Sequence, residues 1–220
     1  MSNIIVFSGT DGSGKSTQIK ILINEFRKKG LSTKYIWARG GYTPLFSSLK
    51  KILKVFLVNK TPHSSKNTFR EKLLQKKSIS KFWLSIATLD LLIYYAVYVR
   101  IVSWLRDVIV CDRYIEDTLI DFKINFPDTF DEKSFLWKFL VLFAPRPNKS
   151  FLLFVPVNVS LTRSKMKEEP FPDTPDTLAF RLRAYLDESI FPSGKYHRID
   201  GQSSIESINK KITVKFKELS

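Results

Sequence analysis

Residues 9–17 carry the groups in this chain that are best suited to chemistry. They read Gly-Thr-Asp-Gly-Ser-Gly-Lys-Ser-Thr and fit the phosphate-binding pattern GxxxxGK[ST]. Glycines let backbone N–H groups turn toward an anion, and the start of a helix adds partial positive charge. We expect Lys15, on an exposed loop, to reach the β- and γ-phosphates and the Ser16 hydroxyl to bind Mg²⁺. The motif predicts that the chain binds a nucleoside triphosphate.

This loop requires a strand before it and a helix after it. Residues 3–8 form an apolar run typical of a buried strand, and residues 18–26 carry apolar side chains at helical spacing. The sequence therefore favours a phosphate-binding loop over an ordinary turn rich in glycine and serine.

A second group of chemical side chains follows the apolar run 108–111. Asp112 and Arg113 come directly after it, so we expect them at the carboxyl edge of a sheet, where ligands bind in such folds. A carboxylate at this edge can hold the Mg²⁺ shell, and a guanidinium offers two parallel hydrogen bonds to a phosphate. A structural salt bridge is the alternative for an isolated Asp-Arg pair, but the phosphate loop favours a site.

Apolar runs typical of strands alternate with segments long enough for helices. This alternation predicts an α/β fold of three layers, with a mostly parallel five-stranded sheet between helices. Gly30 is expected to close the first helix, and a last amphipathic helix is expected from about Ser203. We expect a single domain over residues 1–220, with loops at 61–65 and 168–175. The expected strands are Ile4–Phe7, Lys34–Trp37, Val108–Cys111, Phe151–Val155 and Tyr196–Ile199.

The amino-acid composition indicates where the protein is located and which partners it binds. A single cysteine, Cys111, excludes a disulfide framework and indicates a small core residue in a reducing cytosol. The chain opens on a strand rather than a signal peptide, so a cytoplasmic location is expected. The net charge of +15 is spread widely without a nucleic-acid motif, which favours a solvated basic surface over a nucleic-acid partner.

Residues 82–105 are long and apolar enough to suggest a membrane span. Asp90 and Arg100 in mid-bilayer would cost about 5–7 kcal/mol together. One crossing here would also separate Lys15 from Asp112. We therefore expect a buried or dimer-interface helix and no membrane partner.

The chain resembles the thymidylate kinases, within the wider nucleoside monophosphate kinases. The resemblance covers most of the sequence and includes an Asp, Asp90, placed like that of the family's AADR helix. It is carried by FSGTDGSGKSTQ at 7–18, GGYTPL at 40–45, VCDRYIEDTL at 110–119, PVNVSLTR at 156–163 and IDGQSSIE at 199–206.

The resemblance implies a role for each matching residue. Asp11 is expected to face the acceptor sugar hydroxyl, Tyr114 to lie beside that sugar, and the segment 199–204 to run beside the adenine. The implied catalytic residues are Lys15, Arg113 and Arg163, the last in a mobile lid around 158–175 that also holds Lys165 and Lys167. The implied ATP-binding residues are Asp11, Gly12, Ser13, Gly14, Lys15, Ser16, Thr17 and Arg163, and the implied metal ligands are Ser16 and Asp112.

The acceptor pocket departs from the family pattern. Ala87 aligns with the family's thymine-stacking Phe, and Leu91 aligns with an Arg for the acceptor phosphate. Lys50 replaces a phosphate-binding Arg, and Phe122 replaces a glutamine. We expect Arg39 and Lys50 to compensate as phosphate ligands. Phe122, Trp83 and Tyr114 are candidates for a new aromatic platform, although each is more often a core residue.

Together these features predict a homodimeric, Mg²⁺-dependent ATP:dTMP phosphotransferase. The altered pocket keeps open a diverged kinase for another nucleotide, nucleoside or anionic metabolite. Only the basic charge favours a third class, a nucleotide-binding regulator or nucleic-acid-associated ATPase. A screen of acceptors separates the three classes, because nucleic acid would stimulate ADP release only in the third.

Overall fold

The computed structural model describes residues 2–37, 77–167 and 173–217. The chain divides into two compact units. One comprises Met1–Trp37, Val102–Ile120 and Arg146–Ser220, and the other comprises Ala38–Ile101 and Asp121–Pro145. The first unit contains the sheet, and the described part of the second is helical.

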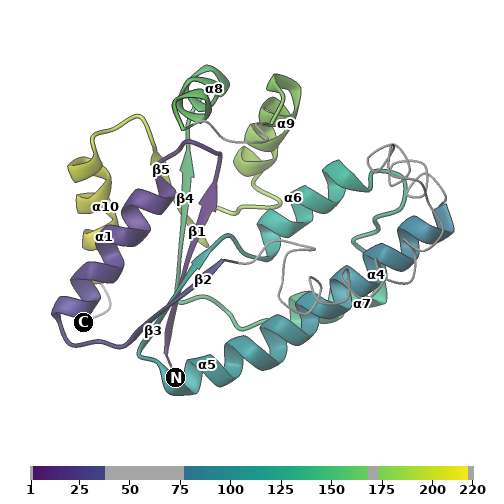
Figure 1. The fold of residues 1–220 in the computed structure, drawn as a ribbon, viewed down its shortest axis with the longest axis horizontal. Helices are drawn as coiled ribbons and strands as arrows, with labels where there is room; N and C mark the ends of the chain where they lie inside the picture. Colours follow the sequence, from purple (N-terminus) through teal and green to yellow (C-terminus); the bar gives the residue numbers. More distant parts are fainter. Residues whose placement is uncertain (1, 38–76, 168–172, 218–220) are drawn as a thin grey trace, which may run out of the picture. The chain divides into compact units, whose positions relative to one another are not determined.

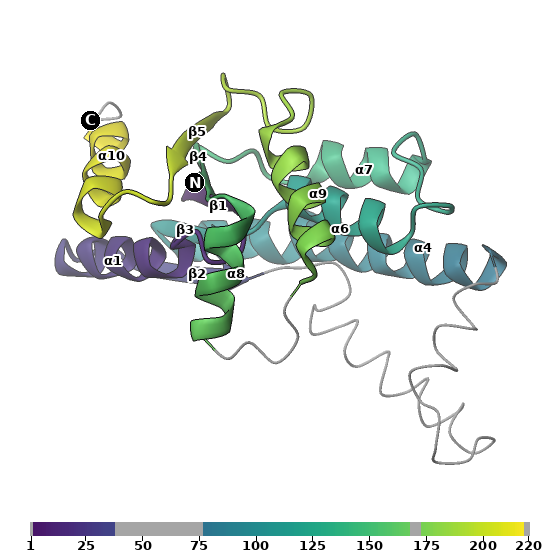
Figure 2. The ribbon, with the colours of Figure 1, turned by 90° about the horizontal axis from the view of Figure 1, so that it is seen from above.

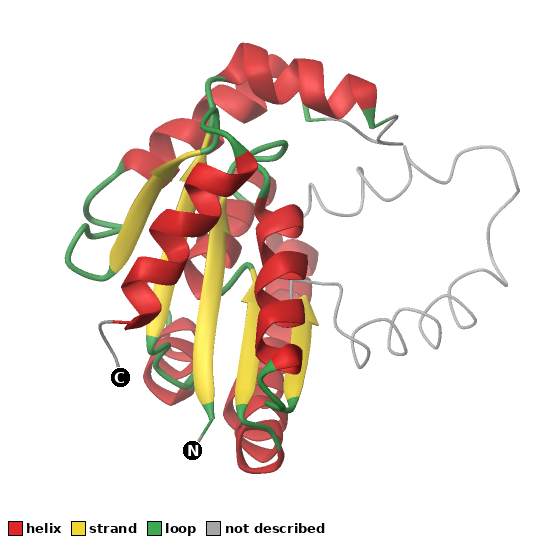
Figure 3. Ribbon diagram, turned by 90° about the vertical axis from the view of Figure 1, so that its left-hand side faces the viewer, coloured by secondary structure: helices red, strands yellow, loops and turns green. Residues whose placement is uncertain are grey.

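The sheet of the first unit has five parallel strands in the order β2-β3-β1-β4-β5 (Figure 3). This order confirms the predicted α/β class and is consistent with a phosphate-loop nucleoside triphosphatase fold. Each run predicted as a strand forms one. The strands are β1 (Asn3–Gly9), β2 (Thr33–Trp37), β3 (Val108–Asp112), β4 (Lys149–Phe154) and β5 (Tyr196–Asp200).

Helices α1 (Lys15–Lys28) and α10 (Ile205–Lys217) pack on each other and on the sheet (Figure 1). The side chains of β1 alternate, so Ile5 and Phe7 face this layer and join Leu22 and Ile212 in the core. Phe7 also stacks on Phe151 of β4, with ring centroids 5.3 Å apart. Complete burial of side chains of this size stabilises the fold by roughly 1.5–3 kcal/mol each.

Both predicted helix boundaries next to the sheet have a local cause. Gly30 has a φ of +77°, a conformation that glycine adopts without strain, and α1 ends just before it at Lys28. The last helix begins at Ile205, slightly after the expected Ser203, because the Ser204 hydroxyl accepts the Ser207 N–H at 3.2 Å and caps it. The predicted loop at 61–65 lies outside the described residues.

Helices α8 (Val157–Met166) and α9 (Pro175–Leu186) also belong to the first unit and pack together (Figure 2). The start of α9 has two local signals. Pro175 occupies the first turn, where no N–H is needed, and the Thr174 hydroxyl accepts the Thr177 N–H at 3.2 Å. Two further helices, α5 (Arg100–Leu105) and α6 (Ile115–Asn125), precede and follow β3.

In the second unit, α4 (Lys77–Ile93) continues into a π-helical turn, η1 (Tyr94–Val99), and packs against α7 (Phe135–Phe143). The Arg100 guanidinium donates to the Phe143 carbonyl at 3.0 Å. The predicted helix 82–105 is therefore one helix from Lys77 to Leu105. It is apolar and long enough to cross a membrane, and 39% of its most apolar stretch is buried in the protein, so the helix is partly a core helix.

Candidate phosphate-binding and catalytic site

The loop after β1 has the backbone conformation that its glycines predict. Gly9, Gly12 and Gly14 have φ values of +135°, +73° and +93°. A Cβ on Gly9 would come within 1.7 Å of the Leu153 carbonyl oxygen, so no other residue fits there. Gly14 directly precedes α1, and the loop leads into the helix N-terminus, as in a phosphate-binding loop.

Lys15 folds back over this loop. Its ammonium donates to the carbonyl oxygens of Gly9 at 2.9 Å and Thr10 at 2.7 Å. The residue is 7% exposed, so the expectation of an exposed lysine is wrong, because its side chain lies against the loop carbonyls. Burial and then the neighbouring Arg113 guanidinium lower the pKa of Lys15 to about 8, while Asp11, Asp112 and Asp117 oppose that shift. The site thus disfavours the charged form of Lys15, and an anion such as a phosphate would stabilise that charge.

Helix α8 is tied to the phosphate loop by two side chains. The Ser160 hydroxyl donates to the Asp11 carbonyl at 2.7 Å. The Arg163 guanidinium donates to the carbonyls of Gly12 at 2.8 Å and Gly201 at 3.0 Å. Arg163, the lid arginine expected from the sequence, thus lies against the loop, whereas Lys165 and Lys167 are exposed.

Asp112 lies where the sequence predicts, at the carboxyl edge of the sheet. Its Cα is in register with Phe7 of β1 and with Trp37 of β2. The Tyr35 hydroxyl donates to its carboxylate at 3.1 Å, and burial, followed by the Asp112 charge, raises the pKa of Tyr35.

The expected metal ligands suit Mg²⁺ by their chemistry. Ser16 is exposed on the first turn of α1, and Asp112 supplies a carboxylate at the sheet edge. Mg²⁺ usually takes one or two protein oxygens and completes its shell with phosphate oxygens and water. Within the described ranges no three His, Cys, Asp or Glu side chains form a metal cluster, and a site of this kind does not need one.

Arg113 follows Asp112 and has an unusual backbone. Its φ is +78°, in the left-handed region that side chains other than glycine rarely adopt. One Nη atom donates to Asp11 in the phosphate loop at 2.5 Å, and the other donates to the Tyr185 hydroxyl at 2.7 Å. Thus Arg113, Asp11 and Lys15 converge in the first unit.

Sequence reasoning missed two members of this constellation. Asp117 is four residues after Arg113 and 1% exposed, and Tyr185 is fully buried on α9. The Tyr185 hydroxyl donates to Asp117 at 2.7 Å. The four-residue spacing between Arg113 and Asp117 could have suggested an ion pair on one helical face. Nothing local marks Tyr185.

The acceptor residues expected from the resemblance have mixed outcomes. Arg39 and Lys50 lie outside the described residues. Tyr114 is buried directly after Arg113. Phe122 is 3% exposed in the second unit and packs on the rings of Phe126, Phe130 and Trp137.

The chain is similar over its full length to a known protein. It is 26% identical to the thymidylate kinase of Desulfotalea psychrophila, and the match covers 98% of this chain and 95% of that protein. No protein-family profile matches the chain. This similarity and the fold support membership of the thymidylate kinase family, and with it a phosphate-loop nucleoside monophosphate kinase.

Proposed function

We propose that this chain, as a member of the thymidylate kinase family, transfers the γ-phosphoryl group of ATP to dTMP and releases dTDP and ADP. The observation that carries the proposal is the convergence of Lys15, Arg113 and Asp11 at a glycine-lined loop and helix N-terminus. Cationic groups at such a loop suit the transfer of a phosphoryl group, whose transition state spreads negative charge over its oxygens.

The proposed reaction needs no covalent intermediate. An oxygen of the acceptor phosphate attacks the γ-phosphorus as the bond to the β-phosphate oxygen breaks, and the chain's residues position and neutralise the phosphates. Lys15 holds the β- and γ-phosphates, Arg113 bridges donor and acceptor phosphates, and Asp11 faces the acceptor sugar. Ser16, and Asp112 through water, would hold Mg²⁺, which would supply positive charge to the phosphates.

Arg163 and helix α8 form the proposed lid over this loop. Arg163 donates hydrogen bonds to two backbone carbonyls, and Ser160 donates one to the Asp11 carbonyl. These bonds hold α8 against Asp11 and Gly12. A guanidinium this close to the loop can turn toward a phosphate once nucleotide is bound. We propose that the residues around 158–175 form a mobile lid and that the whole chain acts as one kinase in the cytoplasm.

A diverged kinase with another acceptor is the second candidate. In the described part of the second unit, Ala87 and Leu91 are 5% and 0% exposed on α4. Neither side chain can stack on a base or bind a phosphate as the aligned Phe and Arg of the family do. This observation favours a relaxed or altered acceptor choice.

An acceptor panel tests the proposal. We expect kcat/KM to be highest for dTMP, with modest discrimination against dUMP and dCMP, because stacking tolerates any base whereas a dedicated hydrogen bond rejects the wrong one. ADP release is measured with dTMP, dUMP, dCMP, dGMP, nucleosides, DNA and RNA. Turnover with a nucleoside or another metabolite alone supports the diverged kinase, and stimulation by DNA or RNA alone supports the nucleic-acid-associated class.

Phe122 is proposed to contribute to the acceptor platform, and its replacement separates that role from packing. Phe122→Ala is expected to raise the KM for dTMP while the KM for ATP stays nearly constant. Phe126→Ala is the matched control, because Phe126 lies one turn further on and packs on Phe122 with ring centroids 6.1 Å apart. Equal lowering of the melting temperature by both variants, without a change in KM, would leave Phe122 only a packing role.

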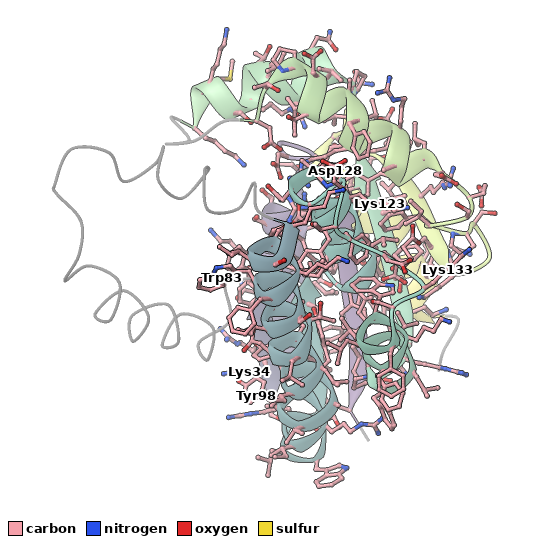
Figure 4. All side chains as sticks on the ribbon, turned by 90° about the vertical axis from the view of Figure 1, so that its right-hand side faces the viewer. Lys34, Trp83, Tyr98, Lys123, Asp128 and Lys133 are labelled. Carbon is pink, nitrogen blue, oxygen red and sulfur yellow. The ribbon has the colours of Figure 1, made fainter. Side chains whose placement is uncertain are left out.

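We propose that the enzyme is a homodimer through the apolar face of α4, η1 and the start of α5. Leu89, Ile93, Val97 and Ile101 recur every four residues and are 46%, 43%, 50% and 47% exposed. Tyr98 lies on this helix as well, with Trp83 near its start (Figure 4). A continuous exposed apolar stripe of this kind marks an interaction surface.

The double variant Ile93→Lys, Val97→Lys is expected to convert the dimer to a monomer, because two ammonium groups would then be buried at the interface. Mass is measured by light scattering after gel filtration. Ile205→Lys is the control, since Ile205 is an equally exposed apolar residue of the first unit. A wild-type monomer, or a dimer that survives both lysines, contradicts this interface.

A further inference from the structure

We propose that Asp117 and Tyr185 are positioning residues that hold the Arg113 guanidinium in its catalytic orientation. The inference rests on the proposed phosphoryl transfer, in which Arg113 bridges two phosphates. It concerns two residues that the family resemblance did not assign.

The side-chain network around Arg113 has a defined direction. One Nη of Arg113 donates to the Tyr185 hydroxyl at 2.7 Å, and that hydroxyl donates its own proton to Asp117 Oδ1 at 2.7 Å. The same Nη lies 3.5 Å from Asp117 Oδ1. The tyrosine therefore links the cation to the anion and fixes the plane of the guanidinium.

Asp117 also controls the backbone at this point. Its second carboxylate oxygen accepts the N–H of Tyr114 at 2.9 Å and the Ser8 hydroxyl at 2.6 Å. Tyr114 directly follows Arg113, so one carboxylate holds both the side chain of Arg113 and the peptide after it. A non-glycine φ of +78° costs free energy and persists only where surrounding contacts enforce it.

The two ends of the guanidinium have different surroundings. The side chains of Arg113 and Asp117 are 7% and 2% exposed, whereas that of Asp11 is 27% exposed. The anchor thus lies on the buried side, and the Asp11 side is the more open one. A phosphate can replace Asp11 at one Nη while Tyr185 and Asp117 keep the other Nη in place.

Tyr185→Phe tests the proposal by removing a single oxygen. We expect kcat for dTMP phosphorylation to fall about 10-fold, the effect of losing one hydrogen bond to a charged group, with the KM for ATP nearly unchanged. Tyr196→Phe is the matched control. Tyr196 is equally buried, and both rings pack on Phe191, at 5.1 Å from Tyr185 and 4.8 Å from Tyr196.

Combined variants separate positioning from stability. If Tyr185 acts through Arg113, Tyr185→Phe lowers kcat no further in an Arg113→Lys background. Asp117→Asn keeps the shape of the side chain and is expected to lower kcat at least as much as Tyr185→Phe. A kcat for Tyr185→Phe equal to that of Tyr196→Phe, or full additivity with Arg113→Lys, overturns the proposal.

A readout without catalysis keeps this test independent of the proposed function. In ¹⁵N NMR the Arg113 guanidinium, assigned with Arg113→Lys, is expected to rotate slowly about its Nε–Cζ bond in the wild type and Tyr196→Phe, and faster in Tyr185→Phe. Equal rotation rates in all three proteins overturn the anchor. A wild type that phosphorylates no monophosphate, but whose Arg113 rotates faster after Tyr185→Phe, overturns the proposed function and retains the anchor.

Discussion

Replacing Lys15 with alanine is expected to lower turnover at least about 100-fold, because a key charge on the transferring phosphoryl group is worth at least that much. The substitution is not expected to destabilise the fold. Since folding lowers the pKa of Lys15 to about 8, the folded state binds this proton less tightly than the unfolded chain. At neutral pH the buried ammonium therefore opposes folding, and Lys15→Ala should melt at or above the temperature of the parent.

Melting curves and turnover, measured on the same preparations, decide this prediction. Lys20→Ala is the control, because Lys20 is exposed on the same helix. A Lys15→Ala protein that keeps more than about a tenth of the activity excludes the proposed role. A large drop in melting temperature would instead mean that the Lys15 bonds to the Gly9 and Thr10 carbonyls hold the loop together.

Replacing Arg113 with lysine is the second change with a large expected effect. It is expected to lower kcat at least about 100-fold, although the positive charge is kept. The Nη atoms of Arg113 reach Asp11 and Tyr185 in different directions. A single ammonium cannot make both contacts and cannot bridge two phosphates in one plane.

The control for this substitution is Arg198→Lys. Arg198 is a half-buried arginine of β5 that donates to the carbonyls of Leu186 and Phe191. Its replacement should change stability slightly and kcat little. Equal kcat values for Arg113→Lys and the parent would show that only positive charge is required at this position.

The sheet and the phosphate loop could be predicted because their signals are local. The run from Ile4 to Phe7 is β-branched and aromatic, and the glycines at 9, 12 and 14 need conformations that other residues avoid. Asp112 could be placed as well, since the carboxyl ends of parallel strands meet at one edge.

The rest of the site depends on contacts between distant residues. Tyr185 meets Arg113 across 72 positions, and no pattern near Tyr185 distinguishes it from any other buried tyrosine. The burial of Lys15 likewise follows from its fold back over the loop, which the motif does not encode. Phe122 shows the opposite problem, because its type suits both an aromatic platform and the cluster in which it packs.

The sheet order also determines when the phosphate-binding loop after β1 can form. Central strand β1 has only β3 and β4 as neighbours, which lie more than a hundred positions later: Ile5 pairs with Val110, and Phe7 with Phe151. Such distant pairings are slow to close. During synthesis β1 therefore remains an unpaired apolar segment until at least half of the chain has emerged. Since Thr10 is held by the Leu153 carbonyl and the Val155 N–H, nucleotide affinity is acquired late in folding.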